Sequence, residues 1–182
     1  MFELITTRLT LRDFRPEDLS SYFCMTQDEK YRRFYSAEDV SMEKAAFLVH
    51  LFQEQATAIP RTHFQLAVCD RNTGEFIGTA GLRLESEGKA SVGCGFRRQF
   101  HHSGLAEEAM TSLLSFGVKY LGINLLYAET LAANKAAIRL CKKMGMVETE
   151  YRVGGVLFAD RKWDTVVLSK WIETANECKE GV

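Results

Sequence analysis

The chain has 182 residues and a formal net charge of -1, a length that suits one domain with a substantial core. A net charge near zero disfavours a protein that mainly grips nucleic acid, because such proteins usually carry a basic excess. No apolar run approaches the ~20 residues that span a bilayer, and the N-terminus does not resemble a signal peptide. The five cysteines are scattered without a CxxC pair, as in reduced cytosolic proteins. We therefore expect a single domain over residues 1–182, cytoplasmic, without a nucleic-acid or membrane partner.

The first part of the chain predicts a strand followed by two helices. Near alternation of apolar and polar residues over 4–13 predicts one half-buried strand. Pro16 followed by two acidic residues predicts the start of a helix. Ser41 is expected to cap a second helix, whose apolar residues recur at i, i+3, i+4 and i+7.

The rest of the chain predicts a meander and then alternating elements. Strands over 64–69, 75–84 and 89–96 are joined by short loops, which predicts antiparallel pairing. A helix over 104–121, a strand over 123–130 and a helix over 134–144 follow, with a right-handed crossover. The last strands, 146–153 and 163–168, are expected to join through Gly154-Gly155, and Ser169 to cap a C-terminal helix. This order predicts an α/β fold, a mixed sheet with helices on its faces.

The end of the strand over 89–96 leads through a polar loop into the helix that begins near Gly104. Free backbone N–H groups and the positive dipole end make a helix start an anion site. Small residues at Gly104 and Ala106 would let a phosphate approach the backbone, and Arg97 and Arg98 could add charge. The same residues also fit a plain helix entry beside solvated arginines, so on their own they leave both interpretations open.

This segment resembles the acetyl-CoA-binding loop of the GCN5-related N-acetyltransferases (GNAT), whose pattern is Q/R-x-x-G-x-G/A. The pattern falls on His101, His102, Ser103, Gly104, Leu105 and Ala106. The sequence departs from it at two positions, since His101 replaces the usual Gln or Arg and His102 replaces a common extra Gly. The loop is therefore expected to hold the pyrophosphate less tightly, or in a different way.

Two further segments resemble the same family. Residues 128–146 are similar to its strand–loop–helix segment, with Asn134 at the family's asparagine. Residues 5–12 resemble the T-x-R-L-x-L-R opening of the subgroup that acetylates the N-termini of ribosomal proteins, and Pro16-Glu17-Asp18 agrees with its next motif. The three matches in order imply the GNAT-like acyl-CoA N-acyltransferase fold, with a central, mostly antiparallel sheet and helices on both faces.

The resemblance implies an acetyl-CoA arm lying between two splayed parallel strands, 89–96 and 123–130. A backbone N–H near Cys94–Phe96 would polarise the thioester carbonyl. The Gly93-x-Gly95 spacing permits a bulge that exposes such a group, or glycines that serve packing alone. The implied cofactor residues are Cys94, Gly95, Phe96, Arg97, Arg98, His101, His102, Ser103, Gly104, Leu105, Ala106 and Asn134. No metal is expected, because no histidine has a partner at ligand spacing.

Candidates for the general base are Glu85, Glu87, Glu129 and Asp164. Glu129 is favoured, because a carboxylate on a central strand is expected to be buried for a purpose, although an exposed or lysine-paired residue is the alternative.

The family's usual donors of a proton to the leaving thiolate fall on Ala137 and Cys141. The Cys141 thiol, with an ordinary pKa near 8.5, could act as the donor, although a buried helix cysteine is more often inert, and water is the alternative donor.

The predicted function is transfer of acetyl from acetyl-CoA to a primary amine, foremost the N-terminal α-amino group of a ribosomal or other protein. The loop over 27–40 would line the acceptor site, and its aromatic residues suit a peptide groove or a flat small molecule. Acetylation of a small-molecule amine is therefore the first alternative. A non-catalytic module that binds acyl-CoA is the second, and the protein is expected to be a monomer or a homodimer.

Overall fold

The computed structural model describes every residue except 87, 159–160 and 173–182. The strands are β1 (Glu3–Ile5), β2 (Leu9–Asp13), β3 (His63–Asp70), β4 (Phe76–Ser86), β5 (Lys89–Phe96), β6 (Leu125–Leu131), β7 (Val147–Phe158) and β8 (Arg161–Trp171). The helices are α1 (Leu19–Thr26), α2 (Glu29–Arg32), α3 (Met42–Thr57), α4 (Leu105–Leu121) and α5 (Lys135–Lys143). Short 3-10 turns occupy Pro16–Asp18 and Arg98–Phe100.

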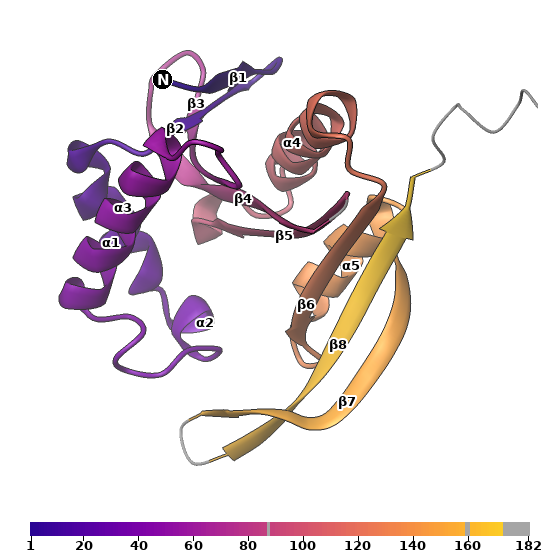
Figure 1. Cartoon of the computed structure of the whole chain (residues 1–182). Helices are drawn as coiled ribbons and strands as arrows, with labels where there is room; N and C mark the ends of the chain where they lie inside the picture. The colour runs from indigo at the N-terminus through magenta and orange to yellow at the C-terminus, as the bar shows by residue number, and fades with distance from the viewer. Residues whose placement is uncertain (87, 159–160, 173–182) are drawn as a thin grey trace, which may run out of the picture.

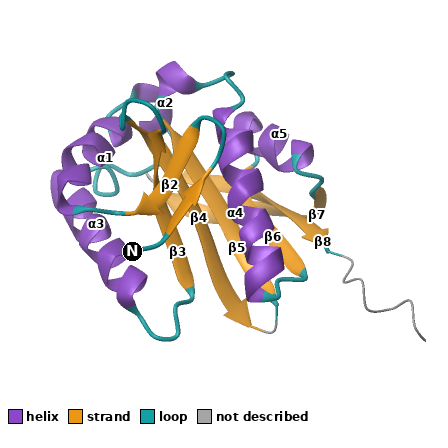
Figure 2. Ribbon diagram, turned by 90° about the horizontal axis from the view of Figure 1, so that it is seen from above, coloured by secondary structure: helices purple, strands orange, loops and turns teal. Residues whose placement is uncertain are grey.

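The strands form one sheet in the order β1-β2-β3-β4-β5-β6-β8-β7. Neighbouring strands are antiparallel except β5 and β6, which are parallel and are joined by α4 (Figure 1). Figure 2 shows α1 and α3 on one side of the strands and α4 and α5 on the other. The predicted mixed, mostly antiparallel α/β fold is confirmed.

The N-terminal strand predicted over 4–13 is wrong, because the chain reverses within it. β1 runs antiparallel to β2, with Leu4 opposite Leu11. The Thr6 hydroxyl accepts a hydrogen bond from the Leu9 backbone N–H at 2.9 Å, and the Thr6 N–H donates to the Leu9 carbonyl at 2.9 Å. A threonine that bonds its own local backbone closes this turn while the apolar alternation continues across it.

Each helical layer buries its own apolar cluster. On one face, Phe14, Tyr22 and Val49 pack under α1 and α3. On the other face, Leu113 of α4 and Leu126 of β6 belong to the larger core cluster. The α3 cap is as predicted, since the Ser41 hydroxyl accepts from the Lys44 N–H at 3.0 Å. None of the described helices is both long and apolar enough to cross a membrane.

The C-terminal hairpin differs from the prediction. Gly154 and Gly155 lie inside β7 and produce a register shift between Arg152 and Val156, rather than joining two strands. Glycine pairs permit bulges as readily as turns, and here β8 continues the pairing beyond them. Ser169 lies within β8 and caps no helix. The C-terminal helix expected after it would fall on residues 173–182, which lie outside the described residues.

Candidate active site

Strands β5 and β6 pair over only a short stretch and then separate. The parallel ladder joins Lys89 to Leu125, Ala90 to Leu126, and Ser91 to Tyr127 and extends no further among the described residues. Figure 1 shows the two strands diverging beyond this point. One edge of β5 is therefore open over residues 92–96, as expected for strands that admit an extended ligand.

Two backbone donors of β5 face this open edge. The N–H of Arg97, the residue after β5, donates to the Ile77 carbonyl of β4 at 2.9 Å. The N–H groups of the odd-numbered residues of β5 therefore point towards β4. Because backbone groups alternate along a strand, the N–H groups of Cys94 and Phe96 point away from β4, towards the gap. The Phe96 carbonyl, on the same edge, accepts from the His101 ring Nε2 at 2.9 Å.

The bulge predicted at Gly93-x-Gly95 is wrong. The β4–β5 register runs without a shift through both glycines, and its irregularity lies between Leu84 and Ser86. A Cβ atom at Gly95 would lie 3.5 Å from the Tyr31 ring, whereas one at Gly93 would meet nothing within 4 Å. Gly95 therefore lies in a regular strand against an aromatic side chain from α2, as the packing interpretation expects.

The start of α4 leaves backbone donors unpaired. Gly104 is the N-cap, with φ of 78°, and no side chain caps the helix. The first helical bond runs from the Glu108 N–H to the Gly104 carbonyl at 3.0 Å. Within the described chain, the N–H groups of Leu105, Ala106 and Glu107 make no hydrogen bond. With the dipole of a 17-residue helix behind them, these donors have the chemistry that suits an anion.

The loop before α4 is held by its own contacts. His101 and His102 are both exposed, and His102 adopts a positive φ of 63°. Arg97 turns back towards the start of β4, where its Nη1 donates to Glu75, the residue before the strand, at 2.9 Å. Arg98 is exposed. Of the two arginines predicted to add charge beside the helix start, Arg97 is thus already paired with a carboxylate.

A clamp from the N-terminal turn fixes the α4 start, and sequence reasoning missed its role. Arg8 donates through Nε to the Glu108 carboxylate at 2.7 Å and through Nη1 to the Ser103 carbonyl at 3.0 Å. The Thr6 hydroxyl donates to Glu108 at 2.6 Å, and the Arg8 N–H at 2.8 Å. The T-x-R-L opening could have pointed to this clamp, because its threonine, Thr6, and its arginine, Arg8, both bind Glu108.

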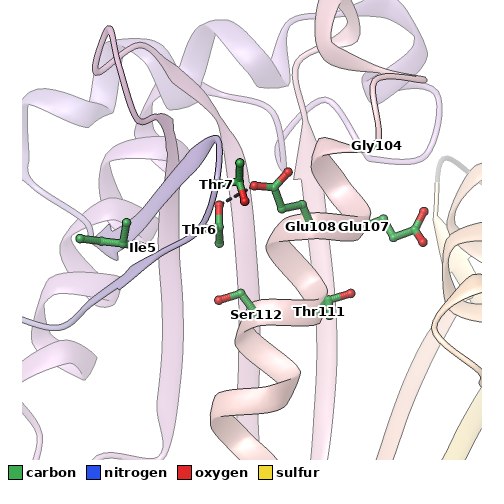
Figure 3. A pocket seen from close by; sticks show the side chains of 8 residues that line it. All are labelled: Ile5, Thr6, Thr7, Gly104, Glu107, Glu108, Thr111 and Ser112. Atoms are coloured by element: carbon green, nitrogen blue, oxygen red, sulfur yellow. Dashed lines mark hydrogen bonds between the residues drawn. The ribbon is translucent and has the colours of Figure 1, made fainter.

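Figure 3 shows the contact between Thr6 and Glu108, which lies in a groove between the β1–β2 turn and α4. The groove has a volume of about 520 Å³ and is lined by Ile5, Thr6, Thr7, Gly104, Glu107, Glu108, Thr111 and Ser112. Partial burial acts to raise the pKa of Glu108, but the hydrogen bonds from Thr6 and Arg8 outweigh it and lower that pKa. The clamp therefore holds a charged carboxylate.

The α5 start is capped, as predicted, by Asn134, whose Oδ1 accepts from the Ala137 N–H at 3.3 Å. The other end of α5 meets α4, since Lys143 pairs with Glu107 at 3.0 Å. At a rise of 1.5 Å per residue, Asn134 lies roughly 13 Å along α5 from that contact. A ligand that touches both helix starts must therefore be extended.

Glu129 is exposed, so the burial expected for it is wrong. Its carboxylate accepts from Arg152 Nη1 and from the Thr165 hydroxyl, each at 3.0 Å. The alternative expectation was an exposed residue or one paired with a lysine. Glu129 is exposed and is paired, but its partner is an arginine. Its role as a base stays a prediction.

The other candidate carboxylates are also engaged. Hydrogen bonds from Tyr127 and Arg83 lower the pKa of Glu85. Hydrogen bonds from the Gly154 N–H and the Tyr151 hydroxyl lower the pKa of Asp164. Glu87 lies outside the described residues. The described alternatives to Glu129 are therefore weak bases.

The cysteines near the gap differ in setting. Cys141 on α5 is buried, at 6% exposure, and burial raises the pKa of its thiol. Cys94 on β5 is exposed. Across the described ranges, no cluster of three or more His, Cys, Asp or Glu residues could hold a metal ion.

Comparison with known proteins points to one family. The family described as "Acetyltransferase (GNAT) domain" matches residues 8–147. An uncharacterised N-acetyltransferase of Bacillus subtilis (strain 168), YoaA, is 28% identical over 149 residues, covering 80% of this chain and 83% of that protein.

Two solved structures share the fold. A putative ribosomal-protein-serine acetyltransferase from Vibrio cholerae superposes with a TM-score of 0.79 at 18% identity, covering 94% of this chain and 98% of that one. The microcin C7 self-immunity acetyltransferase MccE, solved with acetyl-CoA and AMP, gives a TM-score of 0.79 at 11% identity, covering 92% and 94%.

Proposed function

The chain belongs to the GNAT acetyltransferase family and is an acyltransferase, and from that premise we propose that it transfers acetyl from acetyl-CoA to the N-terminal α-amino group of a protein. The observation that carries the proposal is the open edge of β5, with its free N–H groups, leading directly into the uncapped start of α4. One end of this path suits an oxyanion and the other a phosphate.

In this proposal, different groups between the open edge of β5 and the start of α4 bind different parts of acetyl-CoA. The N–H groups of Leu105 and Ala106 bind the pyrophosphate, and Asn134 contacts the extended arm from α5. The N–H groups of Cys94 and Phe96 donate to the thioester oxygen and stabilise the negative charge that develops on it. Acetyl-CoA supplies the activated acyl group, and the loop over 97–104 sets its position.

The settings of the carboxylates favour an α-amine as the acceptor. An α-amino group has a pKa of about 7.7–8.0, whereas a lysine amine is near 10.4, so the α-amine needs far less help to lose its proton. Hydrogen bonds lower the pKa values of Glu85 and Asp164, and Glu129 is paired with Arg152. We assign the proton-accepting role to Glu129, directly or through water, because a weak base suffices for an α-amine.

The leaving thiolate needs a proton donor, and the family's usual positions hold Ala137 and Cys141. Burial raises the pKa of Cys141, so its thiol keeps its proton at neutral pH and is a poor acid. We therefore assign protonation of the thiolate chiefly to water, with Cys141 as the residue to test.

A small-molecule amine is the second candidate acceptor. Tyr31 and Tyr35 stack with ring centroids 4.6 Å apart, and Tyr31 lies against Gly95 on β5. Such an aromatic wall suits a flat molecule as well as a peptide side chain. The structural likeness to MccE, which was solved with AMP, favours testing nucleotide-like amines.

The experiment is a turnover assay with acetyl-CoA and two acceptor panels, followed by mass spectrometry to locate the acetyl group. One panel holds short peptides with free N-termini, each matched to the same peptide with a blocked N-terminus. The other holds small amines, including aminoacyl nucleotide analogues. We expect acetylation of the free α-amine and none of the blocked peptides. Turnover confined to small amines would reject the protein acceptor and retain the transferase.

A further inference from the structure

The gap between β5 and β6 joins two faces of the sheet that carry different side chains. On β5, Ala90 and Phe96 belong to the core cluster that includes residues of α4, so even-numbered residues point to that face. Gly93 and Gly95 therefore lie on the opposite face, which is the side of α1 and α3 (Figure 2). Over residues 93–95, β5 places no side chain beside the gap on this face.

The space above Gly95 is closed by side chains from other elements. A Cβ atom at Gly95 would lie 3.5 Å from the Tyr31 ring, and it would also contact Thr79 at 3.6 Å and Met25 at 3.7 Å. Tyr35, which is 45% exposed, stacks on the Tyr31 ring with the two planes 13° apart. Burial is the largest of the causes that raise the pKa of Tyr31, which agrees with a side chain shielded from water. Tyr31 therefore forms a fixed wall at the level of Gly95.

The space above Gly93 is open and faces the candidate base. A Cβ atom at Gly93 would meet nothing within 4 Å. The parallel ladder pairs Ser91 with Tyr127, and counting on along both strands places Glu129 level with Gly93. Glu129 points to the same face as Gly93, because its neighbour Ala128 belongs to the core cluster on the α4 side. The two glycines thus differ, since one lies under an aromatic ring and the other under free space.

The geometry of a bound thioester gives its acyl chain one direction. Under the proposed function, on which this inference rests, the thioester oxygen accepts from the N–H groups of Cys94 and Phe96. Its sulfur arrives from the side of the α4 start, where the pyrophosphate is held. The three substituents of a thioester carbon lie in one plane and point away from one another. The acyl chain must then leave towards the opposite face, level with Gly95, and there it meets Tyr31.

We propose that Tyr31 sets the length of the acyl group that the protein accepts, because its ring leaves room for acetyl and excludes butyryl and longer chains. The acceptor amine attacks the carbonyl carbon from outside the plane of the thioester, and the open space over Gly93 leaves that approach free. A longer chain could avoid Tyr31 only by bending over Gly93, where it would occupy the path of the amine. Tyr31 is therefore a specificity-determining residue for the acyl donor.

The test measures the affinities of free CoA, acetyl-CoA, butyryl-CoA and hexanoyl-CoA by isothermal titration calorimetry, which needs no acceptor. We expect the wild type to bind hexanoyl-CoA roughly tenfold more weakly than acetyl-CoA, because extra methylenes overpack a filled site. In Tyr31→Ala the order should reverse, since the longer chain fills the space that the ring leaves. Free CoA should bind both proteins equally, because it carries no acyl chain.

Matched variants separate the ring from its hydroxyl and from the fold. Tyr31→Phe keeps the ring and should keep the wild-type preference, whereas Tyr31→Leu, a smaller change than alanine, should admit butyryl-CoA. Tyr120→Ala removes a ring on α4 that is 65% exposed, and it should change no affinity. Circular dichroism melts confirm that each variant is folded.

The outcomes distinguish this inference from the proposed function. A wild type that binds hexanoyl-CoA as tightly as acetyl-CoA would overturn the role of Tyr31 and retain the acetyl-CoA site. A Tyr31→Ala variant that binds every ligand more weakly by the same factor would also overturn it, because a structural role alone has that effect. A wild type that does not bind acetyl-CoA would reject the proposed function, and this inference with it.

Discussion

The two helices that border the gap begin in different ways. α4 begins at Gly104, in a left-handed conformation with no side-chain cap, whereas α5 begins at Asn134, whose side chain accepts from the Ala137 N–H. Both starts carry the same dipole and the same orphan donors. At α5 the chain's own residue satisfies one of these donors, whereas at α4 they stay open.

This difference is the reason that we propose the α4 start, and not the α5 start, as the site for the charged group of acetyl-CoA. Gly104 has no side chain to compete for the donors, and as a glycine it adopts its positive φ without strain. The α4 start is instead fixed from outside, by Arg8 of the N-terminal turn acting on Glu108 and the Ser103 carbonyl. We expect substitutions at α4 to act on ligand affinity and those at α5 to act partly on stability.

The largest expected effect is that of Gly104→Glu on acetyl-CoA affinity. A carboxylate at the helix start repels phosphate and fills the space that phosphate needs, so we expect roughly a hundredfold weaker binding, or about 2.7 kcal/mol. Isothermal titration calorimetry measures it. Gly122→Glu is the matched control, because Gly122 caps the other end of α4 with φ of 65° and open space around it. Equal losses in both variants would mean that backbone strain, and not the anion site, is responsible.

Asn134→Ala is expected to have the next largest effect, and to change both the stability of the fold and the affinity for acetyl-CoA. Loss of the cap should lower the free energy of unfolding by about 1 kcal/mol. Loss of the amide donors should weaken acetyl-CoA binding roughly fivefold, the worth of one hydrogen bond. Asn134→Asp separates the two, because it keeps an oxygen that accepts from Ala137 but has no N–H donor. Urea unfolding should find it as stable as the wild type, and wild-type affinity in this variant would show that Asn134 is only a cap.

The elements that carry the site follow local signals, and these were predictable. Residues 89–96 form β5 as expected, and Gly104, Gly122 and Asn134 bound their helices where the sequence places them. Glycine at a positive φ and asparagine at an N-cap act through their own backbone and next neighbours. Such signals need no knowledge of the rest of the fold.

The failures concern features that a distant segment decides. Whether Gly154-Gly155 forms a turn or a bulge depends on how far β8 continues alongside β7. The pairing of Glu129 depends on β7, a strand that is distant in sequence and supplies Arg152. The clamp joins Arg8 to Glu108 across 100 residues, so the motif that contains Arg8 was visible while its purpose was not.

A smaller effect is expected from loosening the clamp at α4. Arg8→Met removes the guanidinium's bonds to Glu108 and Ser103 but keeps a long side chain and the backbone N–H bond to Glu108. An ion pair this exposed is worth about 0.2–1 kcal/mol, so we expect acetyl-CoA affinity to fall only a few fold. Arg71→Met is the control, since Arg71 binds the Thr6 carbonyl of the same turn without reaching α4. In the Glu108→Gln background the effect of Arg8→Met should shrink, and an undiminished effect would argue against coupling.

The smallest expected effect is the pH dependence of the same clamp. The folded pKa of Glu108 lies below its unfolded value near 4.3, so its charge stabilises the fold above that pH and ceases to do so as pH falls through the folded pKa. Glu108→Gln, which keeps a hydrogen-bonding oxygen but no charge, should be less stable than the wild type by about 0.5 kcal/mol at pH 7. Urea unfolding of both proteins at about pH 3 should find a smaller difference than at pH 7, because a larger fraction of the wild-type carboxylate is then protonated. A difference that stays constant between the two pH values would show that Glu108 fixes the α4 start by its shape and hydrogen bonds, and that its charge contributes nothing.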